Sequence, residues 1–73
     1  MHTHKHTNRP EAGKKYTCVL NGVPVYDAEI QEARGCWATV KVLQPKPGKY
    51  EKHYKEGQVM DIKVQYYEFL ESH

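Results

Sequence analysis

Within residues 57–70, apolar and polar side chains alternate, and this alternation determines the class of fold that the chain can adopt. The apolar positions are Met60, Ile62, Val64 and Tyr66. A period of two, with β-branched and aromatic residues, is typical of a strand with one buried face and one solvent-exposed face. We therefore predict a strand from about residue 59 to 69. The chain is expected to be mainly β, as a small antiparallel sheet or open barrel of about four strands with at most one short helix.

The length of 73 residues allows one small domain. A chain of this size buries only about 60% of the surface that its unfolded form exposes, so its stability is expected to be modest. Six tyrosines and Trp37 supply large side chains that a wholly disordered chain lacks. We predict a single β-rich domain over residues 14–73. Residues 1–13 are polar, histidine-rich and basic, contain Pro10 and show no apolar periodicity, so they are predicted to form a flexible arm.

The dipeptide Asn21-Gly22 predicts a hairpin, because both residue types tolerate the positive φ angles of a type I′ turn. Residues 15–20 alternate before it, and order is expected to begin near Lys15. Residues 23–26 return as the second strand. Pro24 places this strand at an edge, or itself at the strand's beginning, because proline cannot donate to a ladder.

Residues 27–35 allow two interpretations. They form either a short helix, with Asp27 as N-cap and Gly35 past its end, or a continuation of the second strand. A continued strand or a distorted single turn is slightly favoured over the helix, because Ile30 is the one large apolar residue and a helix needs a fuller apolar stripe.

The alternating pattern of residues 36–43 predicts a further strand. This strand is expected to pair as a hairpin with the final strand. Its inward face would carry Cys36, Ala38, Val40 and Val42. Both cysteines, Cys18 and Cys36, are expected to be buried and reduced. The start of the sequence has neither a signal-peptide pattern nor an apolar span, so a cytoplasmic location is expected.

Two surfaces are candidates for binding. The first is an aromatic and basic face, in which Trp37 lies beside Lys63, Gln65 and Tyr67 of the neighbouring strand and would anchor a partner. The alternative is that Trp37 only covers the second side of the sheet. The second surface is the 46–56 loop, whose lysines could neutralise phosphates while its tyrosines stack on unpaired bases. The alternative there is a solvated loop with its tyrosines packed on the sheet edge. The loop residues concerned are Lys46, Lys49, Tyr50, Lys52, Tyr54 and Lys55.

Neither a metal site nor a catalytic site is predicted. The histidines His2, His4 and His6 are more typical of a solvated terminus than of a metal centre. Cys18, Cys36 and His53 lack the close Cys-x-x-Cys spacing of structural zinc sites. The sequence contains no nucleophile elbow, no carboxylate pair in a plausible cleft and no glycine-rich phosphate loop, so we expect a non-enzymatic protein without a cofactor.

Taken over its whole length, the chain resembles the small lytic-phage transcription regulators that bind host bacterial RNA polymerase. The features that carry the resemblance are Lys14-Lys15, Asn21-Gly22, the Trp37 strand, the Lys/Tyr loop and the acidic end Tyr66-Tyr67-Glu68. The resemblance implies a protein that docks on polymerase subunits, disfavours σ-factor engagement at promoters and affects termination. Separately from the resemblance, a monomer is expected. It carries over no site residue. The alternative function is a small β-barrel that binds single-stranded nucleic acid through the 46–56 loop.

Overall fold

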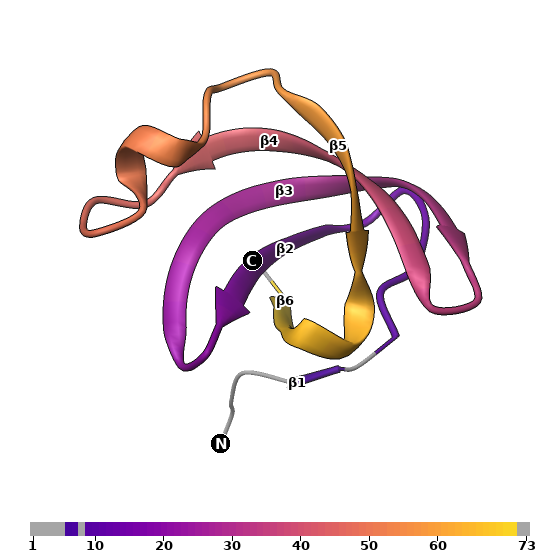
Figure 1. Ribbon diagram of the computed structural model, residues 1–73. Coiled ribbons are helices and arrows are strands. Elements are labelled where there is room, and N and C mark those ends of the chain that lie inside the picture. Colours follow the sequence, from indigo (N-terminus) through magenta and orange to yellow (C-terminus); the bar gives the residue numbers. More distant parts are fainter. Residues whose placement is uncertain (1–5, 8, 72–73) are drawn as a thin grey trace.

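The computed structural model describes residues 6–7 and 9–71, which form one antiparallel sheet with the strand order β1-β6-β2-β3-β4-β5 (Figure 1). The prediction of a mainly β domain with a small antiparallel sheet is confirmed. The strands are β1 (His6–Thr7), β2 (Lys15–Leu20), β3 (Val23–Arg34), β4 (Trp37–Pro45), β5 (Val59–Lys63) and β6 (Tyr67–Glu71). Two 3-10 turns, η1 (Glu51–His53) and η2 (Val64–Tyr66), interrupt the connections.

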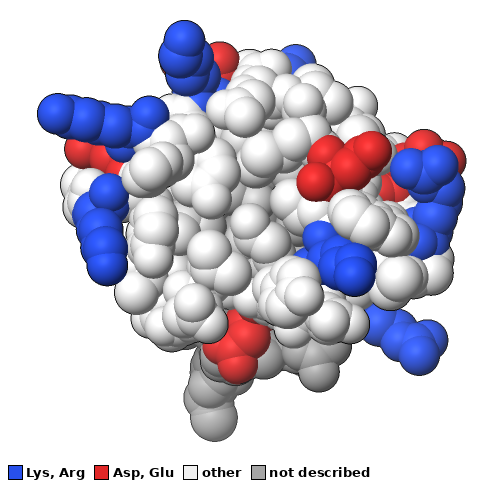
Figure 2. Space-filling view, in the orientation of Figure 1, with Lys and Arg blue, Asp and Glu red and all other residues white. Residues whose placement is uncertain are grey.

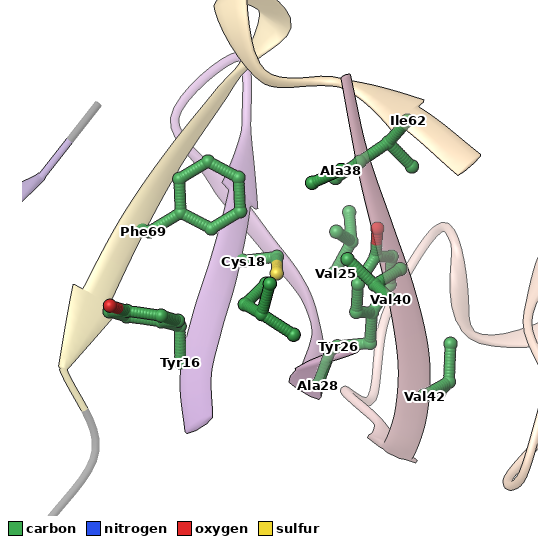
Figure 3. Close-up of a cluster of buried hydrophobic side chains, with 11 residues drawn as sticks. Tyr16, Cys18, Val25, Tyr26, Ala28, Ala38, Val40, Val42, Ile62 and Phe69 are labelled. Atoms are coloured by element: carbon green, nitrogen blue, oxygen red, sulfur yellow. The ribbon is translucent and has the colours of Figure 1, made fainter. Parts of the chain in front are cut away.

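The sheet curls until strands near its two ends contribute to one core. Phe69 on β6 and Ile62 on β5 both point into the interior (Figure 3), and both belong to the same buried cluster. The curvature is concentrated in β3, which has register shifts between Asp27 and Ala28 and between Ile30 and Glu32. Such bulges bend a strand and increase its twist. The buried cluster consists of Tyr16, Cys18, Val25, Tyr26, Ala28, Ile30, Ala38, Val40, Val42, Ile62 and Phe69.

The predicted hairpin at Asn21-Gly22 is confirmed. Both residues have positive φ, 53° and 79°, and Leu20 pairs with Val23 across the turn. Pro24 lies beside a bulge in the β2–β3 ladder, where the absence of its N–H is tolerated.

Residues 27–34 continue β3 as a strand, which confirms the strand interpretation and excludes the helix. Ala28 and Ile30 are completely buried at alternate positions, while Gln31 to Arg34 are exposed. Residues 26–30 are bonded on both sides and residues 31–34 on the β4 side, so a single large apolar anchor is enough to hold the segment.

The prediction of one uninterrupted final strand is wrong. β5 pairs with β4 as expected, but η2 then turns the chain, and β6 pairs with β2 and β1. A 3-10 turn breaks the period of two, so side chains after it no longer continue the faces of β5. Tyr66 consequently lies 58% exposed instead of facing the core.

The N-terminal segment also differs from its prediction. The backbone of His6–Thr7 pairs with β6, Pro10 is buried, and the Gly13 N–H donates to the Ile30 carbonyl at 2.7 Å. Order therefore begins before Lys15, because this segment covers part of the open edge of β6. The rest of the predicted arm, residues 1–5 and 8, lies outside the described residues.

The two cysteines occupy different environments. Cys18 is buried in β2, as predicted, and Cys36 is exposed, contrary to the prediction. β4 begins one residue later than expected, at Trp37, so Cys36 falls in the two-residue turn after β3 together with Gly35, whose φ is 56°. Among the described residues, no helix is long and apolar enough to cross a membrane.

Candidate functional site

Trp37 lies in a row of three residues across the outer side of β3, β4 and β5. It pairs with Arg34 on β3 and with Lys63 on β5, so a cation flanks it on each side. The Lys63 Nζ is 5.7 Å from the centroid of the indole ring, within the range of a cation–π contact. The Trp37 side chain remains 43% exposed. The register of the sheet thus presents one large aromatic ring to solvent between two positive charges.

The adjacent row brings two carboxylates beside these cations. Thr39 pairs with Glu32 on one side and with Asp61 on the other. The Thr39 hydroxyl donates to Asp61 Oδ1 at 2.6 Å, and Arg34 Nε lies 3.8 Å from Glu32 Oε1. In Figure 2, the right-hand side of the molecule, over the β3–β4 hairpin, shows both signs of charge close together. We refer to Arg34, Trp37, Asp61 and Lys63 as the Trp37 face.

Trp37 also stands between two hollows in the surface. Arg34, Trp37 and Asp61 line a hollow of about 380 Å³. A larger hollow of about 750 Å³ lies towards η2 and the N-terminal segment, and Gln65 is among its lining residues together with Trp37. Its described lining includes one cation, Arg9, and no acid. A ring between two hollows can be enclosed by a partner that enters either of them.

Three of the four residues predicted for the aromatic face are brought together. Trp37 and Lys63 are in contact, and Gln65 lines the same hollow as Trp37. Tyr67 is not part of this group: its ring lies 6.1 Å from those of Tyr26 and Phe69 and packs against the core. The cause is η2, which separates Tyr67 from β5.

Two residues of the face, Arg34 and Asp61, were not predicted as site residues. Arg34 belongs to the segment whose helix and strand interpretations were both open, so its row could not be assigned. The sequence places Asp61 on the same face of the strand as Lys63, but its position beside Thr39 depends on the β4–β5 register.

The tyrosines of the 46–56 loop pack inward, as in the alternative interpretation of this loop. The Tyr54 ring meets Tyr26 edge to face at 4.6 Å, and Tyr50 packs against the core. Lys46 is held by Asp27 at 3.2 Å. Both rings are therefore partly buried, which leaves less of each ring available for the predicted base stacking. The lysines Lys49, Lys52 and Lys55 remain exposed, and Figure 2 shows mainly basic side chains on the left, where Figure 1 places this loop.

Burial changes the acidity of the groups beneath the loop. It raises the pKa of the Cys18 thiol to about 12, with a smaller contribution from the negative charge of Asp27. Burial also raises the pKa of Tyr54 to about 12 and that of Tyr26 above its ordinary range, and the neighbouring Cys18 and Tyr67 contribute to the shift of Tyr26. The Tyr26 hydroxyl is enclosed and makes no hydrogen bond of ordinary geometry. All three groups are held in their neutral forms.

Alkaline pH is therefore expected to destabilise the fold. Between pH 9 and 12 the unfolded chain loses the Cys18 proton while the folded chain keeps it, so the free energy of unfolding falls as pH rises. The expected slope from Cys18 is at most about 1.4 kcal/mol per pH unit. Urea unfolding under reducing conditions at several pH values measures this. Cys18→Ala should reduce the slope, whereas a flat wild-type profile would contradict the assignment.

Among the described side chains, no group of three or more His, Cys, Asp or Glu is arranged to hold a metal ion. The histidines His2, His4 and His6 fall outside the described side chains.

The chain matches no protein-family model, no curated protein and no solved structure. The candidate binding surface is accordingly inferred from the chain's own residues.

Proposed function

We propose that this chain is a non-enzymatic protein-binding domain that docks on host bacterial RNA polymerase through the Trp37 face. In this proposal it acts in the bacterial cytoplasm and inhibits promoter initiation by disfavouring σ-factor engagement. An effect on termination would follow from occupancy of the same enzyme. The partner is taken from the resemblance to small lytic-phage transcription regulators, and the binding surface is taken from the geometry.

The exposure of Trp37 is the observation that carries the proposal. A tryptophan that is 43% exposed leaves a large apolar ring in water in the free protein. Tryptophan and arginine are the residue types most enriched among interface hot spots, where they fill desolvated pockets. Trp37 and Arg34 line a common hollow and so form such a pair within one small surface.

The mixed charge of the face favours a protein partner over nucleic acid. Arg34 and Lys63 are cations, but Glu32 and Asp61 lie in the adjacent row. A phosphate backbone would be repelled by these two carboxylates, whereas a protein surface can match both signs. The hollows beside Trp37 open to solvent and do not enclose a substrate, which supports a binding role over a catalytic one.

Nucleic-acid binding through the 46–56 loop is the second candidate, favoured only by the exposure of Lys49, Lys52 and Lys55. Because both tyrosine rings are partly buried, such binding would be mainly electrostatic, and its affinity would fall steeply with salt.

Direct binding measurements separate the two functions. The intact chain is immobilised and exposed, at low and raised salt, to nuclease-treated core RNA polymerase or to a random single-stranded oligonucleotide. We expect polymerase to be retained in both salts and the oligonucleotide to bind weakly. A variant with Lys49, Lys52 and Lys55 changed to glutamine should still retain polymerase. Binding of the oligonucleotide alone, lost at raised salt and in this variant, would overturn the proposal.

A further inference from the structure

The outer edge of β5 has no strand beside it. β5 is the last strand in the sheet order, with β4 on one side and no paired strand among the described residues on the other. Its first residue, Val59, is 58% exposed, and Asp61 is exposed as well. Unpaired strand edges present a row of N–H and C=O groups that can bind another extended chain.

The register shows which backbone groups point outward from this edge. The Val64 N–H donates to the Cys36 carbonyl at 3.0 Å, and the Val42 N–H donates to the Gln58 carbonyl at 2.7 Å. In an antiparallel ladder, pairs that exchange hydrogen bonds alternate with pairs that do not. The two bonds mark the Cys36/Val64 and Val42/Gln58 pairs as hydrogen-bonded. Counting alternate pairs between them, Lys63, Asp61 and Val59 form non-hydrogen-bonded pairs with β4. Their backbone N–H and C=O groups point away from β4, towards the open edge.

We propose that the partner protein adds an extended segment along the β5 edge, and that its residues facing Lys63, Asp61 and Val59 are acidic, basic and aliphatic. This inference rests on the proposed function and names the chemistry of the recognised segment. Main-chain hydrogen bonds to the edge would supply affinity, and the cross-strand side-chain pairs would supply specificity.

The edge and the Trp37 face are parts of one surface. An added strand would extend the row Arg34–Trp37–Lys63 by one position, beside Lys63. The hollow lined by Arg34, Trp37 and Asp61 is formed by the same three strands, so a side chain of the added segment, or of the surface around it, can enter the hollow and contact the indole. One partner segment can in this way bury Trp37 and pair with the edge.

Charge argues against a second copy of this chain as the occupant. Two β5 strands paired antiparallel over their full length would place Asp61 opposite Asp61, and like charges directly opposite one another are destabilising. The register that pairs Asp61 with Lys63 instead overlaps only three residues before η2 ends the strand. A partner strand with an acid, a base and an aliphatic residue at alternate positions avoids both problems.

A proline in the edge tests the backbone contribution separately from the side chain. Asp61→Pro and Asp61→Ala both remove the carboxylate and its hydrogen bond to Thr39, but only the proline also removes the outward N–H. Because that N–H is not used by β4, the proline should leave the β4–β5 ladder intact. Binding of core RNA polymerase is measured for both variants, with far-UV circular dichroism to confirm folding. Val59→Pro and Val59→Ala repeat the comparison at the other end of the edge if Asp61→Pro fails to fold.

We expect the proline variant to bind at least about tenfold more weakly than its alanine counterpart, because it leaves a partner carbonyl unpaired. Equal binding by the two variants, with binding still lost in Trp37→Ala, would overturn the edge inference and leave the proposed function standing. Failure of the wild-type chain to bind polymerase would overturn the proposed function itself. A wild-type dimer in sedimentation that Asp61→Pro dissociates would overturn the inference in favour of a second copy.

Discussion

Replacing Trp37 by alanine is expected to weaken binding to RNA polymerase by about 30-fold or more while leaving the domain folded. An interface hot spot contributes about 2 kcal/mol or more, which corresponds to this change in affinity. The fold should tolerate the change because the indole is 43% exposed and lies outside the buried cluster. We expect a loss of stability of about 1 kcal/mol or less. Equilibrium binding and urea unfolding of the same preparation measure the two effects.

Tyr66→Ala is the matched control for this experiment. Tyr66 is also an exposed aromatic residue, at 58%, but it lies in η2 and its ring is not among the described linings of the hollows beside Trp37. The account requires Tyr66→Ala to bind nearly as well as the wild type. Equal losses in both variants would indicate a general effect of exposed aromatic area and would contradict a site centred on Trp37.

Replacing Phe69 by alanine is expected to remove most of the free energy of unfolding at 25 °C. Phe69 is completely buried, and its ring meets Tyr16 edge to face at 5.8 Å. It connects β6 to β2 from inside the curled sheet (Figure 3). Truncating a buried phenylalanine costs about 3–5 kcal/mol. A domain of this length has a stability near the lower end of the usual range, about 5 kcal/mol, so little stability would remain.

Circular dichroism during urea titration tests this expectation. The wild type should show one cooperative transition, and the Phe69→Ala transition should begin at the lowest urea concentrations, with part of the variant already unfolded without urea. Tyr66→Ala, three residues earlier and outside the core, should shift the midpoint only slightly. A Phe69→Ala midpoint equal to that of the wild type would show that β6 is not needed to close the core.

The strands that follow a plain alternation of apolar and polar residues were predictable from the sequence. The Asn21-Gly22 turn and the pairing of β4 with β5 also followed, because each depends on local chemistry or on chain proximity. The interruption at η2 could not be predicted from the sequence, because Val64 and Tyr66 fit a period of two as well as their neighbours do. Only the curvature of the sheet, which carries β6 across to β2, requires the turn.

The candidate site was predictable to the same extent. Trp37, Lys63 and Gln65 could be grouped from alternation and hairpin pairing. Tyr67 was wrongly included, because the turn that redirects it left no signal in the pattern. Arg34 was missed because its position beside Trp37 requires β3 to remain a strand to its end, which the sequence of that segment did not decide.

The central claim is that Trp37 becomes enclosed when the protein binds RNA polymerase. Hydroxyl-radical footprinting with mass spectrometry tests it directly, because Trp37 is the single tryptophan and is exposed in the free chain, as Tyr66 is. The account predicts that oxidation of Trp37 falls strongly in the complex while oxidation of Tyr66 changes little. Unchanged oxidation of Trp37 in a chain that is fully bound to polymerase would contradict it.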